Sequence, residues 1–311
     1  MESCTAVAPS STANLGPGYD VFGLALDALQ DRVKITKLKG KDGGITIKMS
    51  DSNIPTRTES NSAGLVIIKM TQDYGIKDNL HIEVKKGVPA GYGMGSSAAS
   101  AAAAAVALKA LYRLKIGRDR LVEYAAEGEV ASAGAKHYDN VSAAVLGGFV
   151  VSSRMVDGTP CFIRIEPPRD LAMVVAVPAM PVPAKKTEMA RSVLPKEVPL
   201  KSAVQNISGA SIIVAGCALG DVEIMASGVR DAIVEPARKH LIPGYDGVKE
   251  NALAAGALAV AISGAGPSMI AFLKGNKDAK KVALAMAAGF KDAGLGCRTL
   301  VCGPSRGAHV V

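Results

Sequence analysis

The feature that most constrains this chain is a glycine-rich segment that runs directly into an alanine-rich one. Residues 88–95 read VPAGYGMG, and alanine dominates Ser96–Leu114, which follows. Alanine has the highest helix propensity, so the run predicts a helix, with a serine as its N-cap. Glycines at alternate positions let the backbone approach an anion, and a helix N-terminus offers free N–H groups. The pattern therefore predicts a phosphate cradle, the alternative being a glycine-rich turn that holds no ligand.

This loop differs from two common nucleotide-binding patterns. No lysine follows its last glycine, Gly95, as the G-x-x-x-x-G-K-[ST] loop requires. Its glycines, Gly91, Gly93 and Gly95, do not have the G-x-G-x-x-G spacing of dinucleotide-binding folds either. The sequence therefore supports neither of those folds.

Composition is that of an ordinary globular protein of about two domains. Hydrophobic residues make up 49% of the 311 residues and charged residues 21%, which excludes intrinsic disorder. The net charge of +8 would suit nucleic acid, a membrane surface or a small anion. The basic residues are scattered or in short pairs, however, and no Trp is present to stack on bases. We interpret them as a solvated surface and expect no nucleic acid or membrane partner. The pairs are Lys85-Lys86, Lys185-Lys186 and Lys280-Lys281.

Cysteine usage and the N-terminus indicate a cytoplasmic location. The chain has five cysteines, an odd number, without a C-x-x-C spacing, so neither a disulfide framework nor a zinc ribbon is expected. The N-terminal residues lack the pattern of a signal peptide. The best candidate for a membrane span, the uncharged Gly256–Leu273, contains a Ser-Gly-Ala-Gly-Pro sequence. It predicts a strand, a glycine turn and a second strand rather than a membrane span.

Local patterns predict a mixed chain of two parts. The N-terminal Pro9–Tyr19 is expected to be a loop, and strands and helices alternate after it. Pro167-Pro168 interrupts regular structure, so we place a domain boundary there, giving domains 1–166 and 167–311. The second domain ends in a β-α-β pattern typical of α+β folds.

Three segments together resemble the motifs of the GHMP small-molecule kinases, which act on galactose, homoserine, mevalonate and phosphomevalonate. The glycine loop, with the pattern P-x-G-x-G-M-G-S-S-A-A-S, resembles their ATP-binding motif. Pro9–Asp20 resembles their first motif and Ile262–Ser268 their third, so the resemblance spans nearly the whole chain. It is strongest for the branch that acts on homoserine, which also matches at His137–Val141 and Glu235–Arg238. Two departures, Tyr19 for Phe and Met94 for Leu, keep an apolar residue of similar bulk.

The resemblance implies a two-domain α+β GHMP kinase fold. Its N-terminal domain would contain a left-handed βαβ unit and the ATP loop, and its C-terminal domain would be ferredoxin-like. The implied activity is transfer of the ATP γ-phosphate to the side-chain hydroxyl of L-homoserine. The product, O-phospho-L-homoserine, would serve threonine biosynthesis. By the same resemblance the ATP-binding residues are Pro89, Ala90, Gly91, Tyr92, Gly93, Met94, Gly95, Ser96, Ser97, Ala98 and Ala99.

Homoserine is a zwitterion, so its site needs a carboxylate for the ammonium and a guanidinium for the carboxylate. Asp20 is the candidate for the ammonium, with Asn14 beside it. The resemblance assigns Arg191 and Arg238 to the substrate carboxylate, and Arg230 is a rival for Arg238. It implies the following substrate-binding residues: Asn14, Asp20, His137, Asn140, Thr187, Arg191, Arg238 and Gly264.

The resemblance also implies Mg²⁺ as a cofactor beside ATP. Magnesium prefers hard oxygen ligands and keeps several waters, so one hydroxyl and one carboxylate suffice beside the ATP phosphates. By resemblance these ligands are Ser97 and Glu129. Together with Asn140, which we expect nearest to the reacting hydroxyl, they form the catalytic set. Because consecutive side chains diverge, Asp139 should not face the same hydroxyl. We therefore expect direct transfer without a protein general base.

Two other functions stay open. Another GHMP kinase, of the mevalonate type, would rely on a catalytic aspartate with a lysine partner rather than on paired arginines and His-x-Asp-Asn. A non-catalytic amino-acid or nucleotide sensor could keep the same fold, but the presence of Ser97, Glu129 and Asn140 disfavours it. A homodimer is one oligomeric state that we consider. The sequence is silent on feedback by threonine.

Overall fold

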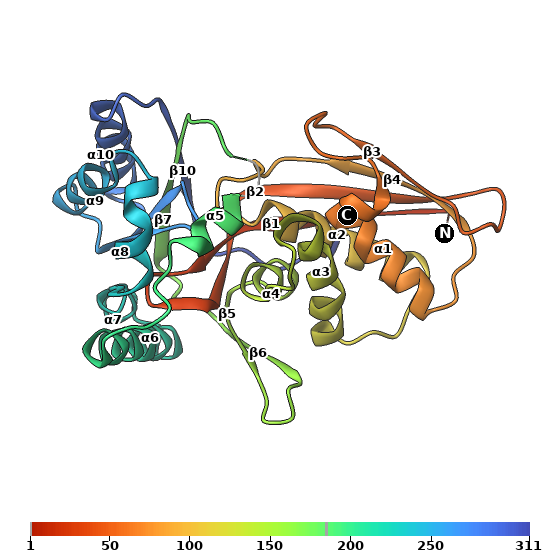
Figure 1. The fold of residues 1–311 in the computed structure, drawn as a ribbon, viewed down its shortest axis with the longest axis horizontal. Helices are drawn as coiled ribbons and strands as arrows, with labels where there is room; N and C mark the ends of the chain where they lie inside the picture. Colours follow the sequence, from red (N-terminus) through yellow and green to blue (C-terminus); the bar gives the residue numbers. More distant parts are fainter. Residues whose placement is uncertain (1, 184–185) are drawn as a thin grey trace.

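A computed structural model describes residues 2–183 and 186–311 of the chain. Figure 1 shows two bodies side by side, one built on the long strands of the N-terminal half and the other on a smaller sheet. The larger sheet has seven strands in the order β11-β1-β2-β4-β3, with β5 pairing with β2 and β6 with β5. Its strands are β1 (Ser3–Asn14), β2 (Gly18–Leu38), β3 (Ile45–Met49), β4 (Asn79–Lys85), β5 (Phe149–Arg154), β6 (Pro160–Ile165) and β11 (His309–Val310).

Four helices gather on one face of this sheet (Figure 1). They are α1 (Ser62–Asp73), α2 (Ser96–Leu111), α3 (Arg118–Ala133) and α4 (Asp139–Leu146), and a short 3₁₀ turn, η1 (Thr58–Ser60), precedes α1. The parallel strands β3 and β4 are joined through η1 and α1, which forms a βαβ unit. The alanine-rich helix α2 contacts β1, β2, α1 and α3, because short side chains let it approach all of them closely.

The start of α2 differs from the sequence prediction. The N-cap position belongs to Gly95, which has a φ of 66° and no side-chain cap, and Ser96 is already helical. The Ser96 hydroxyl instead donates a hydrogen bond of 2.8 Å to the carbonyl of Val88. The Ser96 side chain therefore links the end of the glycine-rich loop to its start at Val88 and does not cap the helix.

The second sheet has four antiparallel strands in the order β10-β7-β9-β8. Its elements are β7 (Leu171–Pro178), α9 (Tyr245–Ala254), β8 (Ala259–Ile262), β9 (Met269–Lys274), α10 (Ala279–Asp292) and β10 (Cys297–Cys302). This β-α-β-β-α-β sequence of elements is ferredoxin-like. The uncharged stretch Gly256–Leu273 forms β8, a turn and β9, as predicted from its sequence.

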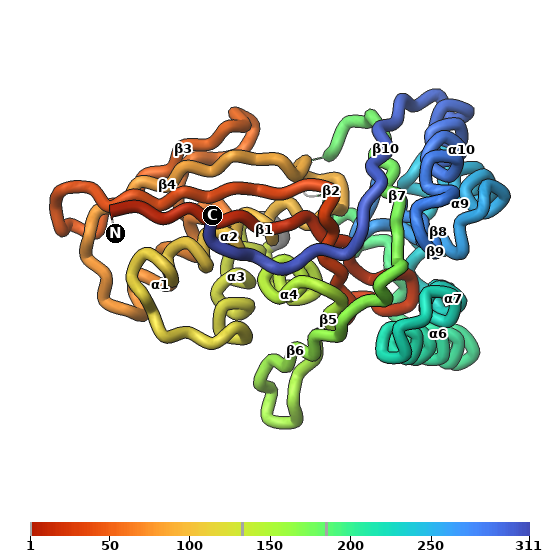
Figure 2. Tube along the Cα trace, turned by 180° about the vertical axis from the view of Figure 1, so that it is seen from behind, coloured from red at the N-terminus to blue at the C-terminus, as the bar shows by residue number. Residues whose placement is uncertain are grey.

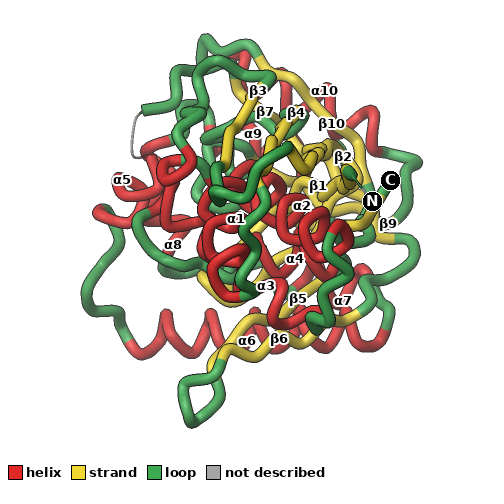
Figure 3. The backbone as a smooth tube through the Cα atoms, turned by 90° about the vertical axis from the view of Figure 1, so that its right-hand side faces the viewer, coloured by secondary structure: helices red, strands yellow, loops and turns green. Residues whose placement is uncertain are grey.

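A helical insertion separates β7 from α9. It contains α5 (Lys186–Ser192), α6 (Leu200–Leu219), α7 (Val222–Ser227), α8 (Val234–Arg238) and the 3₁₀ turn η2 (Lys239–Leu241). Helix α6 lies at the margin of the molecule (Figure 3) and is long and apolar enough to cross a membrane by length and composition alone. It is the one such helix among the described residues, and a single case is weak support for a membrane span.

The expectation of a loop over Pro9–Tyr19 is wrong. Most of this segment belongs to β1 and to the start of β2, and only residues 15–17 form a turn between them. Serine and threonine usually favour turns because their hydroxyls compete for backbone partners. Here those hydroxyls are buried and paired within the fold, as when Ser10 donates to the carbonyl of Leu26 at 3.2 Å.

The predicted domain boundary falls in the connection between β6, which ends at Ile165, and β7, which begins at Leu171. The division into 1–166 and 167–311 stays a prediction. The last residues leave the second sheet and return to the first, where Val310 of β11 pairs with Ala6 of β1. Figure 2 shows this return, with the C-terminal segment running beside β1.

A fully buried carboxylate, Asp31 on β2, ties the glycine-rich loop to both of its flanking elements. One oxygen accepts the backbone N–H of Gly87 at 2.9 Å. The other accepts the hydroxyl of Ser100 on α2 at 2.7 Å and pairs with the ammonium of Lys86. Lys86 is therefore buried, contrary to our interpretation of the basic pairs as solvated surface. Its ammonium also donates to the carbonyl of Ser96 at 2.8 Å.

Candidate active site

The three sequence motifs meet where the two sheets adjoin. The backbone N–H of Ser11 donates to the carbonyl of Met94 at 3.1 Å, which joins the first motif to the glycine loop. The hydroxyl of Ser263 donates to the carbonyl of Gly93 at 2.7 Å, which joins the third motif to the same loop. The amide of Asn14 donates to the carbonyl of Gly264 at 2.9 Å, which joins the first motif to the third.

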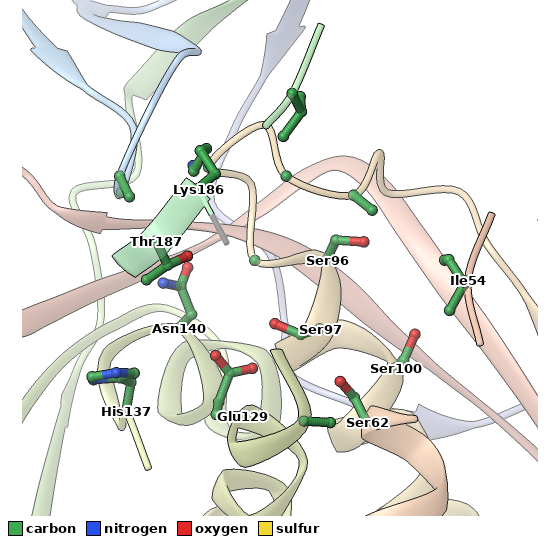
Figure 4. Close-up of a pocket in the computed structure, with 18 of the residues that line it drawn as sticks. Ile54, Ser62, Ser96, Ser97, Ser100, Glu129, His137, Asn140, Lys186 and Thr187 are labelled. Atoms are coloured by element: carbon green, nitrogen blue, oxygen red, sulfur yellow. The ribbon is translucent and has the colours of Figure 1, made fainter. Parts of the chain in front are cut away.

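A cavity of about 420 Å³ opens at this junction (Figure 4). Its lining is apolar at Met49, Ile54 and Pro55 and charged where Asp20 and Arg191 lie. Figure 4 shows Ile54 and Ser62 at one side, Ser96 and Ser97 in the middle, and His137, Asn140 and Thr187 at the other. The predicted site residues that line it are Asn14, Asp20, Ala90, Gly91, Gly93, Gly95, Ser96, Ser97, Glu129, His137, Asn140, Thr187, Arg191, Arg238 and Gly264.

Five predicted ATP-binding residues do not line this cavity: Pro89, Tyr92, Met94, Ala98 and Ala99. Met94, Ala98 and Ala99 are completely buried in the core of the first body. The hydroxyl of Tyr92 donates to the carbonyl of Met180 at 3.0 Å. These residues support the loop and the start of α2 without lining the cavity.

The three loop glycines have a packing role that the sequence did not reveal. Gly91, Gly93 and Gly95 all have positive φ, at 84°, 75° and 66°. A Cβ atom on Gly93 would lie 2.1 Å from the carbonyl oxygen of Ser263, and one on Gly95 would lie 2.0 Å from the hydroxyl of Ser11. We expected glycine here to let an anion approach the backbone. The structure adds that glycine lets the three motifs approach one another.

Opposite charges meet at the far end of the cavity. Arg191 on α5 donates to both carboxylate oxygens of Asp20, at 2.7 and 2.9 Å, and lies 3.1 Å from Nδ1 of His137. Burial and the positive charge of Arg191 lower the pKa of His137, which favours a neutral ring that accepts from the guanidinium. The guanidinium groups of Arg191 and Arg238 lie 5.4 and 5.1 Å from the ring centre of Tyr19.

Of the two rival arginines, Arg238 is the one on the cavity. It is 3% exposed, and its Nε donates to the carbonyl of Ala190 at 2.8 Å. Arg230 is exposed and does not line the cavity. Burial lowers the pKa of Arg238, the expected result when a cation is held away from water.

Glu129 on α3 and Ser97 on α2 form a pair of hard oxygen donors inside the cavity. The two side chains hydrogen-bond to each other, and Glu129 is 7% exposed. Burial, with a further contribution from the charge of Asp139, raises the pKa of Glu129 to about 7. A divalent cation would offset the cost of this buried negative charge, so the donor set fits Mg²⁺. Within the described residues, no group of three or more His, Cys, Asp or Glu side chains could hold a metal alone. Phosphate oxygens would have to complete the coordination.

Asp139 and Asn140 open α4 and both line the cavity. The expectation that their side chains diverge is wrong. Asp139 folds back so that its Oδ1 accepts the backbone N–H of Asn140 at 2.7 Å and lies 3.5 Å from the Asn140 amide nitrogen. The Asn140 oxygen accepts the hydroxyl of Ser11 at 2.8 Å, which leaves its NH₂ group for the cavity. Burial raises the pKa of Asp139 to about 6.

Lys186 is one of several residues of the cavity that were missed in the sequence. It was interpreted as half of a basic surface pair, of which Lys185 lies outside the described residues. The signal that could have found it is its position directly before Thr187, a predicted substrate residue.

Comparison with known proteins agrees with this geometry. The chain matches the family models "GHMP kinases N terminal domain" over residues 61–148 and "GHMP kinases C terminal" over residues 213–292. These two models define its class and confirm the α+β fold class predicted from the sequence.

Several relatives place the chain within that class. It is 38% identical to a homoserine kinase of Thermoplasma volcanium, over 89% of this chain and 86% of the relative. It is 39% identical to one of Aeropyrum pernix, over 97% and 96% of the two chains. The crystal structure of homoserine kinase from Cytophaga hutchinsonii superposes with a TM-score of 0.92 at 35% identity, covering 100% of this chain and 98% of that one. The chain therefore belongs to the homoserine kinase family of GHMP kinases.

The packing of the glycine loop generates a stability prediction. Gly93→Ala adds a Cβ that meets the backbone oxygen of Ser263, so the motif junction must shift. We expect the free energy of unfolding to fall by roughly 1–3 kcal/mol, the usual range for overpacking, in urea denaturation. We expect ATP affinity, measured by calorimetry, to fall as well.

The matched control is Gly247→Ala in α9, where an added Cβ has no neighbour within 4 Å. It should leave the unfolding free energy unchanged or slightly raised, because alanine favours a helix. Wild-type stability and ATP affinity in the Gly93 variant would contradict the role of this contact.

Proposed function

We propose that this protein transfers the γ-phosphate of ATP to the side-chain hydroxyl of L-homoserine, giving O-phospho-L-homoserine for threonine biosynthesis. One observation supports it above the others: the glycine-rich loop and a pair of opposite charges, Asp20 and Arg191, line one cavity. The apolar lining at Met49 and Ile54 suits a nucleobase. The triphosphate would then follow the glycine loop to the start of α2, where backbone N–H groups and the helix dipole favour anions.

The charged end of the cavity suits a zwitterion. In the free protein, Asp20 and Arg191 neutralise each other through two hydrogen bonds. An amino acid brings one charge of each sign, so its ammonium can pair with Asp20 and its carboxylate with Arg191 and Arg238. Paired charges avoid the cost of an uncompensated buried charge. Mevalonate has a carboxylate but no ammonium and would leave Asp20 without a cation.

Magnesium is part of this proposal. Ser97 and Glu129 would hold it, as their converging oxygens support. When bound, the ion supplies charge neutralisation for the phosphate oxygens. The residues of the chain do the rest: the loop orients the triphosphate, and the start of α2 stabilises its negative charge.

We propose direct transfer without a protein general base. The homoserine oxygen forms a bond to the γ-phosphorus while the bond to the β-phosphate oxygen breaks, and ADP leaves. Phosphoryl transfer passes through a loose transition state in most analyses, so the hydroxyl can lose its proton late, to the phosphate or to solvent. Asn140 would orient the hydroxyl through its NH₂ group, since its oxygen is already bonded to Ser11.

Two alternatives and two further expectations remain proposals. The L. major mevalonate kinase shares the fold at a TM-score of 0.70 and 17% identity, which shows the fold alone. A non-catalytic sensor would not need Ser97 and Glu129 at the phosphate end.

A cytoplasmic location agrees with five free cysteines and with ATP as substrate. Homodimer formation stays a prediction.

The test of the function is an ADP-release assay with Mg-ATP and four acceptors in parallel. L-homoserine should be phosphorylated far faster than mevalonate, galactose or L-serine, because it alone combines both charges with a hydroxyl at the right reach. Equal turnover of mevalonate would reject the substrate assignment. Nucleotide and homoserine binding without ADP release would favour the sensor.

The proposed carboxylate site predicts a specific kinetic loss. Truncating one partner of a buried charge pair costs about 2–5 kcal/mol, so Arg238→Ala should lower kcat/KM for homoserine by roughly 30-fold or more. The KM for ATP should move much less. Arg230→Ala, which removes an exposed arginine outside the cavity, is the control and should stay close to wild type. Wild-type homoserine kinetics in the Arg238 variant would remove that residue from the site.

The proposal that transfer needs no protein general base is tested with variants of two residues in α4. Asp139→Asn keeps an oxygen that can accept the Asn140 N–H, and it should retain activity within about tenfold, because a true base contributes about 10²–10⁴-fold. Asn140→Leu should lose much more, since nothing then orients the hydroxyl. The measurement is kcat/KM between pH 5 and 9.

Because both side chains line the cavity, the opposite ranking is informative. An Asp139 base with a pKa of about 6 must be deprotonated to act, so activity would fall as the pH drops through that value. A loss of more than 10²-fold in Asp139→Asn, with this acidic limb removed, would show that the enzyme uses an aspartate base.

A further inference from the structure

Lys186 is a cation in the cavity to which no role has yet been given. It is the first residue of α5, and its ammonium donates a hydrogen bond to the carbonyl of Gly266 in the third motif. It lines the same cavity as Gly93 and Ser97. Figure 4 shows it above Thr187 and Asn140.

The described surroundings of Lys186 contain a second positive charge. In the parts of the chain that the structure describes, no carboxylate forms an ion pair with this ammonium. The charge that acts most on it is the positive one of Arg238. Burial and this neighbour lower the pKa of Lys186 to about 7. A partly buried cation near another cation is costly unless an anion joins them, and the cavity is where one could enter.

We propose that Lys186 binds the terminal phosphate of ATP and stabilises it during transfer. This inference rests on the proposed function, because it takes ATP as the occupant of the cavity. A lysine ammonium is a compact point charge on a flexible stem, suited to follow a phosphate that moves between two oxygens. The contact with Gly266 holds the ammonium at the edge of the loop until the phosphate arrives.

The order of residues along the cavity selects the terminal phosphate. Ile54 lies at the side suited to the nucleobase, and Ser97 at the start of α2 lies between it and Lys186 (Figure 4). In Figure 4 Thr187 lies between Lys186 and Asn140, and Asn140 is where we place the acceptor hydroxyl. The phosphate closest to that hydroxyl is the one transferred, so a cation there contacts the γ-phosphate rather than the nucleoside or the α-phosphate.

The test compares two nucleotides that differ in this phosphate. The affinities of ADP and of the non-hydrolysable ATP analogue AMP-PNP are measured by calorimetry with Mg²⁺, in the wild type and in Lys186→Met. The loss of a charge-assisted contact should weaken AMP-PNP binding by roughly tenfold or more, while ADP affinity changes less than threefold. The kcat for homoserine should fall at least as much. Lys186→Arg should restore part of both.

Two further variants separate charge from structure. The side chain in Lys186→Gln can still donate to the Gly266 carbonyl but has no charge. This variant should therefore bind the nucleotides as the Met variant does if the phosphate contact matters. It replaces the Met variant in the test if that variant does not fold. Lys274→Met is the control for lost charge. Its side chain is 53% exposed, outside the cavity, and pairs with Glu223 at 3.3 Å. It should bind both nucleotides as the wild type does.

The outcomes distinguish this inference from the function on which it rests. Equal weakening of ADP and AMP-PNP in both Lys186 variants, or no weakening, would overturn the γ-phosphate contact while the enzyme assignment stands. A wild-type protein that binds neither nucleotide and releases no ADP with homoserine would overturn both.

Discussion

The hydrogen bond from the Ser263 hydroxyl to the carbonyl of Gly93 is the contact on which the site depends, because it joins the two bodies at the glycine-rich loop. The same hydroxyl lies 2.9 Å from that of Thr12, so the first motif meets the other two at one atom. Glycine at position 93 is what allows the approach, since any Cβ would collide with the Ser263 carbonyl. The cavity thus exists only when both bodies are packed together.

Behind the loop, a second buried contact fixes its other side. The Asp31 carboxylate accepts from Gly87 before the loop and from Ser100 after it. The buried negative charge of Asp31 is tolerated because Lys86 pairs with it. This ion pair contributes more to the orientation of the loop than to the stability of the fold. The loop is therefore held at its base by Asp31 and at its tip by Ser263. Only its inner face is left for a ligand.

Much of the fold could be predicted from local sequence, because helix α2, the strands of the second sheet and the Gly256–Leu273 turn all follow from composition and periodicity. The three motifs also indicated which segments must meet. The failures have a common physical cause. Pro9–Asn14 is a strand whose hydroxyls find partners in distant parts of the fold: Ser10 at the carbonyl of Leu26, Ser11 at Asn140 and Thr12 at Ser263. Lys86 is buried in an ion pair with Asp31, and no local pattern showed this because the two residues lie 55 positions apart in the sequence.

The geometry of the site shows the same limit. Sequence spacing predicted that Asp139 and Asn140 diverge, yet Asp139 turns back to accept the next N–H, which brings both into the cavity. The pair Lys185-Lys186 carried no local sign that Lys186 would reach Gly266, 80 residues further on. Patterns in the chain identify residue types and elements. The partner of a polar side chain depends on contacts that only the assembled fold creates.

The return of the C-terminal segment to the first sheet has a mechanical consequence. The second body is attached to the first at two places, at the β6–β7 connection and at the strip between β10 and β11. The first attachment contains the buried Pro167 and Pro168, and the second is bonded to β2 through Gly303 and Asp27 at 2.7 Å. A body held at two points can swing only about the line that joins them. The two connections therefore restrict any movement of one body relative to the other to rotation about one axis.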